Sequence, residues 1–164
     1  MPRRGISLIE LTITMLIVGI LAAVASPQFS SALAHYRVEA VAARVTADLN
    51  YVRRTAMNTS SNRSLEFTIN PGGQHQYKSI GSTAVSDPNH PGQDYIVSVP
   101  SIAPNVDLQS VSFDGNSKVV FNHYGLPLTG SPLGPLAAAT IVIASGSEQR
   151  TIVVDPLTGK AAVQ

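Results

Sequence analysis

A long apolar run near the N-terminus is the feature that most constrains this chain. The run extends from Ile6 to Ala25 and contains a single charged side chain, Glu10. A helix of about 20 apolar residues is long enough to cross the hydrocarbon core of a bilayer. A carboxylate near the bilayer centre costs at least about 2.5–3.5 kcal/mol on insertion scales. We therefore predict a membrane-spanning helix in which Glu10 needs a partner.

The basic residues around this run predict its orientation. Arg3 and Arg4 precede it, and no further Lys or Arg occurs before Arg37. By the positive-inside rule, the N-terminus faces the cytoplasm. The chain after Pro27 is then expected on the opposite side of a membrane that it crosses once.

Three interpretations of the N-terminus fit these properties. A plain anchor explains the length of the run but not Glu10. A removable secretory signal would end at Ala25, where small residues satisfy the cleavage rule, but it also leaves Glu10 unexplained. In the third interpretation, Gly5-Ile6-Ser7-Leu8-Ile9-Glu10 resembles the type IV prepilin signature. The start of the mature chain, Ile6 or Ser26, distinguishes the last two.

The prepilin resemblance implies a role for three residues. In that family a prepilin peptidase cuts after a glycine and methylates the new N-terminus, and a glutamate pairs with the N-terminal amine of a neighbouring subunit. Gly5 and Ile6 would then be the cleavage and N-methylation positions, and Glu10 the subunit-assembly residue. The physics agrees, because an Ile6 amine and the Glu10 carboxylate lie about one helical turn apart. Each would neutralise the other in a low-dielectric setting.

A helical pattern continues beyond the apolar run. Pro27 interrupts that run, so we predict a second, amphipathic helix from about Gln28 to about Met57, ended by turn-forming residues. Its apolar residues recur every three or four positions. They are Val38, Val41, Val45, Leu49, Val52 and Ala56. Such a stripe needs a covering layer, which the rest of the chain would supply.

From Ser64 onward the pattern alternates with the period of a strand. The expected strands are 64–69, 76–80, 95–99, 106–113, 118–121, 140–143, 150–154 and 160–163. The turn at Asp114-Gly115-Asn116 predicts a hairpin between the fourth and fifth strands. Residues 122–136, rich in Pro and Gly, are expected to be irregular. Helix and strands together predict an α+β fold with an antiparallel sheet.

The C-terminal pattern resembles the GspH/FimT family of minor pseudopilins and pilins. The resemblance rests on Phe121, Gly125, the hairpin of 140–143 and 150–154, and the closing Gly159-Lys160. The family fold is a long N-terminal helix, half transmembrane and half amphipathic, packed on an antiparallel β-sheet domain. The expected parts are a leader peptide (1–5), a transmembrane assembly helix (6–27), an amphipathic helix (28–63) and a globular β domain (64–164).

The same resemblance implies a structural subunit and not an enzyme. The expected function is that of a minor pseudopilin of a type II secretion system, anchored in the bacterial inner membrane with its C-terminal domain in the periplasm. Its expected partners are other pseudopilins, prepilin peptidase and membrane lipid, with no small-molecule substrate.

The alternative is a FimT-like minor pilin of a type IV pilus that takes up DNA. DNA-binding members carry a Gly-Arg-x-Arg sequence, whereas this chain has Gly159-Lys160-Ala161-Ala162. Lys160 is then the one candidate DNA contact. Because phosphate contacts supply non-specific affinity, DNA is not the expected partner.

The remaining sequence shows no catalytic or metal-binding pattern. The chain has no cysteine, which excludes thiol chemistry and cysteine-ligated metals. His75, Asp87, His90 and Asp94 fall in one stretch, but their spacing matches no ligand template. We interpret that stretch as a surface loop and expect no metal, cofactor or catalytic residue.

Two further features bear on nucleic-acid binding. Arg53 and Arg54 are adjacent, which is typical of a solvated helix end and only weakly indicates a nucleic-acid patch. Tyr77, Tyr95 and Tyr124 are expected to pack on strands and not to form a stacking platform. The formal net charge of +1 gives no bulk attraction to nucleic acid.

Overall fold

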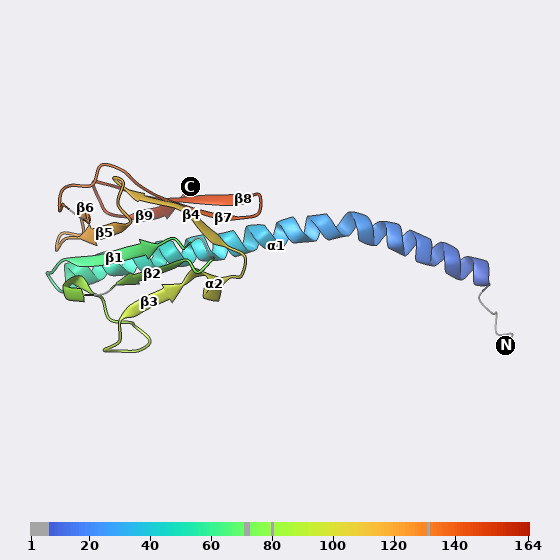
Figure 1. The fold of residues 1–164 in the computed structure, drawn as a ribbon, viewed down its shortest axis with the longest axis horizontal. Helices are drawn as coiled ribbons and strands as arrows, with labels where there is room; N and C mark the ends of the chain where they lie inside the picture. The colour runs from blue at the N-terminus through green and yellow to red at the C-terminus, as the bar shows by residue number, and fades with distance from the viewer. Residues whose placement is uncertain (1–6, 71–72, 80, 131) are drawn as a thin grey trace. The chain divides into compact units, whose positions relative to one another are not determined.

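Figure 1 shows the chain in a computed structural model. The structure describes residues 7–70, 73–79, 81–130 and 132–164, and residues 24–27 by their backbone only. The chain divides into two compact units, residues 1–33 and residues 34–164. Each unit is described by itself below.

The helix α1 runs without a break from Leu8 to Asn58. The expected helix start at Pro27 is therefore wrong, whereas the expected long N-terminal helix, half apolar and half amphipathic, is confirmed. A proline removes one backbone hydrogen bond from a helix, and a helix that is long on both sides can continue past that loss. The first unit contains the apolar part of α1, and the second contains the part that bears the stripe.

The apolar part of α1 exposes its side chains. Its large apolar residues from Leu8 to Leu21 are 49% to 80% exposed. Among the described residues, α1 is the one helix long and apolar enough to cross a membrane, with a mean hydropathy of 2.4 over its most apolar stretch. Such a surface is stable against lipid or against other apolar helices.

The stripe on the second half of α1 is buried, as predicted. Its six residues, from Val38 to Ala56, are all 0% or 1% exposed. Residues three and four apart share one face of a helix, so this face alone can enter a core. The core residues that cover it come from two sheets.

The first sheet has five strands in the order β3-β2-β1-β5-β6, and each neighbouring pair is antiparallel. Its strands are β1 (Arg63–Thr68), β2 (Gln76–Ser79), β3 (Tyr95–Ser98), β5 (Lys118–Phe121) and β6 (Pro127–Thr129). A 3-10 turn (Gly81–Thr83) and a short helix α2 (Val99–Ile102) flank β3 in sequence.

The second sheet has four strands in the order β4-β7-β8-β9, again all antiparallel. Its strands are β4 (Asp107–Phe113), β7 (Ala139–Ser145), β8 (Glu148–Val154) and β9 (Ala161–Val163). The predicted hairpin between β7 and β8 is confirmed, with Ser145 opposite Glu148.

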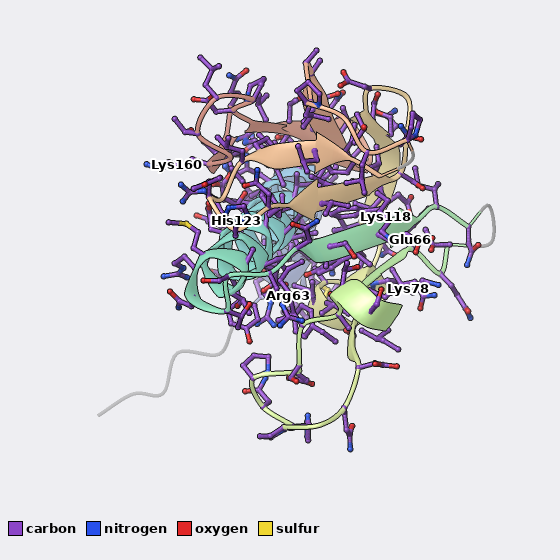
Figure 2. The ribbon with its side chains drawn as sticks, turned by 90° about the vertical axis from the view of Figure 1, so that its left-hand side faces the viewer. Arg63, Glu66, Lys78, Lys118, His123 and Lys160 are labelled. Carbon is purple, nitrogen blue, oxygen red and sulfur yellow. The ribbon has the colours of Figure 1, made fainter. Side chains whose placement is uncertain are left out.

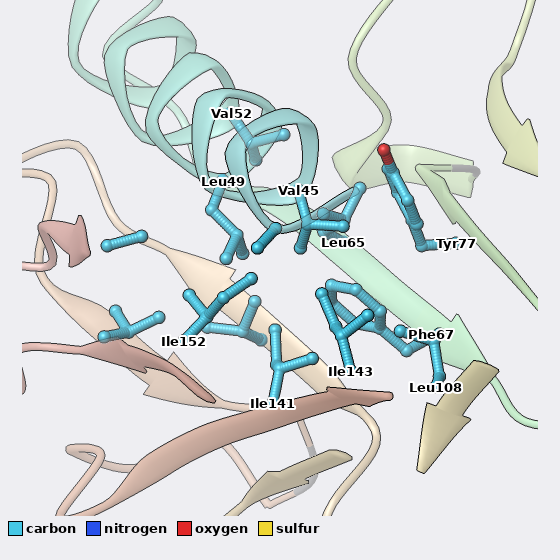
Figure 3. Close-up of a cluster of buried hydrophobic side chains, with 14 of the residues drawn as sticks. Val45, Leu49, Val52, Leu65, Phe67, Tyr77, Leu108, Ile141, Ile143 and Ile152 are labelled. Carbon is cyan, nitrogen blue, oxygen red and sulfur yellow. The ribbon is translucent and has the colours of Figure 1, made fainter. Parts of the chain in front are cut away.

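The two sheets and α1 enclose one hydrophobic core (Figure 3). The five-stranded sheet contributes Leu65, Phe67 and Tyr77, and the four-stranded sheet contributes Leu108, Ile141, Ile143 and Ile152. Alternate residues of each strand point to the same face, so each sheet presents one apolar face to α1. The predicted α+β fold, with a helix packed on antiparallel sheets, is confirmed.

The predicted hairpin between β4 and β5 is wrong, because the two strands belong to different sheets. The turn itself forms, with positive φ at Asp114 and Gly115. However, the Asp114 carboxylate accepts hydrogen bonds from the backbone N–H groups of Ala137 (2.7 Å) and Ala138 (2.8 Å). The turn is thereby tied to the segment that leads into β7, and β5 leaves to pair with β1.

Residues 122–136 were expected to be irregular, but they contain β6. This strand has three residues and pairs with β5, Val120 lying opposite Leu128. It is too short to show alternation, and it begins at a proline, which sheets tolerate at their edges. Sequence periodicity could not detect it.

Candidate assembly site

Glu10 lies exposed in the first turn of α1. The Ser7 carbonyl accepts hydrogen bonds from the backbone N–H groups of Glu10 and Leu11, both at 3.1 Å. A carboxylate is favoured in this first turn, where unpaired N–H groups leave partial positive charge. Glu10 is the one Asp, Glu, Lys or Arg between positions 7 and 36.

The other polar side chains near Glu10 are satisfied within the helix. Thr12 Oγ1 donates to the Ile9 carbonyl and Thr14 Oγ1 donates to the Leu11 carbonyl, both at 2.9 Å. Among the described residues, nothing pairs with the Glu10 carboxylate. Thr12 and Thr14 can thus enter an apolar environment unaided, whereas Glu10 still needs a partner.

Gly5 and Ile6, the predicted cleavage and methylation positions, lie outside the described residues. Their assignment stays a prediction from the sequence.

A second cluster of polar contacts lies at the C-terminal end of α1. Arg53 Nε donates to the Thr158 carbonyl (2.8 Å) and to the Gly125 carbonyl (3.2 Å). The prediction of a solvated helix end is therefore wrong for Arg53, because this side chain lies toward two loops. Arg54 is exposed, as predicted.

The two loops touch through glycines. A Cβ on Gly159 would lie 2.0 Å from the Gly125 carbonyl oxygen, and Gly159 has φ +68°. A Cβ on Gly125 would lie 2.8 Å from Met57 Sδ, and Gly125 has φ +79°. Both positions therefore require glycine for close approach and for a left-handed backbone.

Lys160 follows this contact and is exposed. Its carbonyl accepts a hydrogen bond from the Asp155 backbone N–H at 3.0 Å. Within the described chain, the Lys160 ammonium forms no ion pair. Figure 2 shows Lys160 and His123 on one side of the domain, with Lys78, Glu66 and Lys118 on the other. Lys160 therefore lies apart from Lys78 and Lys118.

The buried carboxylate of this protein belongs to a structural network. Asp48 is 6% exposed and accepts hydrogen bonds from the Tyr77 hydroxyl (2.5 Å) and from Arg44 Nε (3.0 Å). Arg44 also donates to the Tyr95 hydroxyl at 3.1 Å. Burial, with the nearby Asp48 carboxylate, raises the pKa of both tyrosines, so both phenols stay protonated. The network fastens α1 to β2 and β3.

The residues considered for a metal site do not converge. His75 was expected in a surface loop but is 6% exposed, and its Nε2 lies 3.1 Å from Asp107 Oδ1. It is buried because it directly precedes β2 and contacts the start of β4. His90 instead pairs with Asp87 at 3.1 Å within its own loop. No group of three or more potential ligands occurs in the described parts of the chain.

The three tyrosines that were expected to pack on strands differ in their exposure to solvent. Tyr77 and Tyr95 are buried on strands, as predicted, but Tyr124 is 69% exposed. Tyr124 lies in the loop between β5 and β6, where Asn122 Oδ1 accepts hydrogen bonds from the N–H groups of Tyr124 and Leu126, both at 2.9 Å. The loop geometry turns its ring outward.

Comparison with known families decides the identity of the fold. A sequence model of the prokaryotic N-terminal methylation motif matches residues 1–26, and that of the type II transport protein GspH matches residues 27–158. The chain belongs to the GspH family. The resemblance to the prepilin signature and to GspH/FimT proteins is thereby confirmed.

Solved structures agree with the GspH-family fold. Two crystal structures of the type IV minor pilin FimU from Pseudomonas aeruginosa match with TM-scores of 0.54 and 0.51, each at 14% identity. Each match covers 77% of this chain, and 87% and 91% of the FimU chains. At this identity the similarity shows the fold alone. No curated protein sequence matches the chain significantly.

Membership in the GspH family makes the chain a pilin-like structural subunit. Gly125 and Gly159, on which the resemblance partly rested, are the points where two loops meet in the structure. Sequence reasoning missed the function of Arg53, which holds these loops together. One feature of the sequence pointed to this role: Arg53 lies beside the buried stripe. It also follows, by three positions, Asn50, another polar residue that bonds to the C-terminal segment.

Proposed function

We propose that this GspH-family subunit is a minor pseudopilin of a type II secretion system. In this proposal prepilin peptidase cuts the chain after Gly5 and methylates Ile6. The protein is inserted once in the bacterial inner membrane, with its C-terminal domain in the periplasm, and then joins other pseudopilins in a short filament that supports protein secretion. It is a structural subunit and not an enzyme.

The observation that carries the proposal is the Glu10 carboxylate, which lies on an exposed apolar helix and has no partner among the described residues. An N-terminal amine created at Ile6 would lie about one turn away along the helix. In an assembly of such helices, the amine of one subunit would neutralise the Glu10 of its neighbour. A lone carboxylate in the same setting would be strongly disfavoured, so the pair selects one axial register.

The proposal assigns a part to each segment. Residues 1–5 are the leader, 6–27 the transmembrane and assembly part of the helix, 28–58 its amphipathic part, and 59–164 the following turn and the globular β domain, so the expected boundary at position 63 moves back to the end of α1. The apolar, exposed surface of α1 before position 24 supports the second assignment, and the buried stripe supports the third.

Glu10→Gln tests the assembly role. The amide keeps the shape of the side chain but cannot neutralise an amine, so we expect membrane insertion and processing with loss of co-assembly. Cross-linking between helices, together with recovery of co-assembled subunits, measures this outcome. Thr14→Val is the matched control, because its hydroxyl is already satisfied within the helix. Normal assembly of the Glu10→Gln chain would refute the role.

The start of the mature protein provides an independent test. Mass spectrometry of the membrane-extracted chain is expected to find N-methylated Ile6 as the first residue. A chain beginning at Ser26 would instead identify a secretory signal and end the proposal.

A second candidate is a FimT-like minor pilin that binds DNA. Lys160 favours it, because this side chain is exposed and forms no ion pair with the described residues, but the segment offers no second basic residue in the family's DNA-binding position. A salt-dependent gel shift with the full chain in detergent tests this candidate. Retardation of DNA that is lost in Lys160→Ala would support it over secretion.

A further inference from the structure

The loops held by Arg53 expose an apolar surface. We call residues 122–126, residues 155–160 and the last turn of α1 the loop junction. Its exposed apolar side chains are Tyr124 (69%), Leu157 (83%), Met57 (42%) and Leu126 (38%). Gly125 contacts Met57, and Gly159 contacts Gly125, so these residues belong to one surface.

The tips of both loops are held in place within the chain. Asn122 Oδ1 fixes the first loop through the N–H groups of Tyr124 and Leu126. Asp155 Oδ1 fixes the second through the N–H groups of Leu157 (2.8 Å) and Thr158 (3.3 Å), and these bonds lower the pKa of the Asp155 carboxyl. Tyr124 and Leu157 are therefore displayed on ordered loops, which reduces the entropy cost of binding a partner.

The charges around the loop junction are mostly basic. Arg53 is engaged by loop carbonyls, and Arg63, at the start of β1, by the Ala84 carbonyl. Arg54 and Lys160 are exposed, and neither forms an ion pair within the described chain. The one carboxylate of the loops, Asp155, faces its own backbone. The surface therefore complements an acidic partner.

The combination of exposed apolar side chains and a few cations favours a protein over a nucleic acid as the partner of the loop junction. Strong non-specific DNA binding draws on many phosphate contacts, about 6–10 in a typical example, whereas two exposed cations, Arg54 and Lys160, lie beside the exposed aliphatic side chains of the loop junction. Aromatic and basic side chains around an apolar centre are typical of protein-binding hot spots. His123, whose ring lies 3.9 Å from that of Tyr124, extends the aromatic surface.

We propose that the loop junction docks a protein that presents an apolar pocket rimmed by carboxylates. Tyr124 and Leu157 are the anchors that enter the pocket, and Arg54 and Lys160 meet its rim. The inference rests on the proposed function in one respect, because we expect this partner among the other subunits of the same filament.

Site-specific photo-crosslinking in cells that produce the full chain tests the docking surface. A photoreactive residue at position 124 or 157 is expected to capture one filament subunit through a peptide that contains Asp or Glu. A photoreactive residue at position 133 is the control, since Leu133 is also 62% exposed but lies beyond the far end of β6. It is expected to give no such product.

Variants then test the two anchors and the rim. In a chain with the photoreactive residue at position 157, Tyr124→Ser should lower the yield at least about tenfold, as expected for a hot-spot tyrosine. Ile96→Ser, on the exposed face of β3, should leave the yield unchanged. Lys160→Glu should lower the yield, whereas Lys78→Glu should not.

Several outcomes would overturn the proposal. These are capture of nucleic acid or lipid, a product equally abundant at position 133, or no product at positions 124 and 157. A photoreactive residue at position 17, on the apolar part of α1, tests the assembly role independently of the docking surface. Capture of subunits at position 17 alone would leave the proposed function standing and remove the docking surface.

Discussion

Gly159 is subject to two structural constraints, one on its backbone conformation and one on the space around it. Its φ of +68° is disfavoured for other residues, and a Cβ would lie 2.0 Å from the Gly125 carbonyl oxygen. We expect Gly159→Ala to destabilise the fold by more than the roughly 1–2 kcal/mol of a left-handed residue alone, because the backbone contact must also open. Denaturant unfolding of the purified chain measures the loss.

Gly146 provides the matched control for this substitution. It has φ +60°, but nothing lies within 4 Å of the position that a Cβ would occupy. The loss of stability in Gly146→Ala should therefore come from backbone strain alone, without a steric contact. Equal losses for the two variants would show that the loops do not depend on their close approach.

Tyr77 makes a different residue-scale contribution through its hydroxyl. Tyr77→Phe removes the donor at 2.5 Å from the buried Asp48 carboxylate and leaves this carboxylate with fewer hydrogen-bond donors, Arg44 Nε at 3.0 Å among them. A buried polar group that loses a partner costs about 1–3 kcal/mol, so we expect a loss of that size in the free energy of unfolding. Tyr36→Phe, at a position 71% exposed, should change stability little. A neutral result at position 77 would contradict the network.

At the scale of elements, β9 depends on α1. Asn50 donates to the Ala161 carbonyl and accepts from the Ala161 N–H, both at 3.2 Å. The side chain thus pairs with an edge strand as a neighbouring strand would. Asn50→Ala should increase hydrogen exchange at the Ala161 amide while β7 amides stay protected. Asn58→Ala, at the exposed end of α1, is the control, and unchanged exchange at Ala161 would refute the pairing.

The elements that were predictable from the sequence are those with strong periodicity. The stripe from Val38 to Ala56 predicted the buried face of α1. The two strands at 140–143 and 150–154 were expected from the strand pattern, and the family resemblance implied that they form a hairpin. In contrast, the turn at Asp114 did not predict which strands pair. Its carboxylate bonds to residues 137 and 138, which are remote in sequence, and local patterns carry no information about such contacts.

Some residues of the candidate site could likewise be predicted from the sequence, and others could not. Glu10 stands out in the sequence because a charge interrupts an apolar run. Arg53 resembles any other arginine at a helix end, and its role appears only when residues 125 and 158 reach it. His75 was similarly misjudged, because burial at the start of β2 depends on Asp107 of the other sheet.

At the scale of the whole molecule, the buried apolar side chains of the described chain all lie between Val38 and Ala161. The core is thus complete without the first unit, residues 1–33. We expect residues 34–164 alone to unfold in one cooperative transition, followed by circular dichroism on heating. A broad transition with exposed hydrophobic surface would show that the first unit is needed for folding.

The attachment of α1 within the second unit also has a mechanical consequence. Along this part of the helix, Glu39 pairs with Arg150 of β8, Arg44 bonds to Tyr95 of β3, and Arg53 bonds to the loop before β9. The buried stripe, from Val38 to Ala56, spans the same part of the helix and packs into the core that both sheets share. A force along the helix axis would act on these three contacts in shear. They must then break nearly together and not one after another. A subunit built in this way can transmit tension from its helix to its β domain before it unfolds.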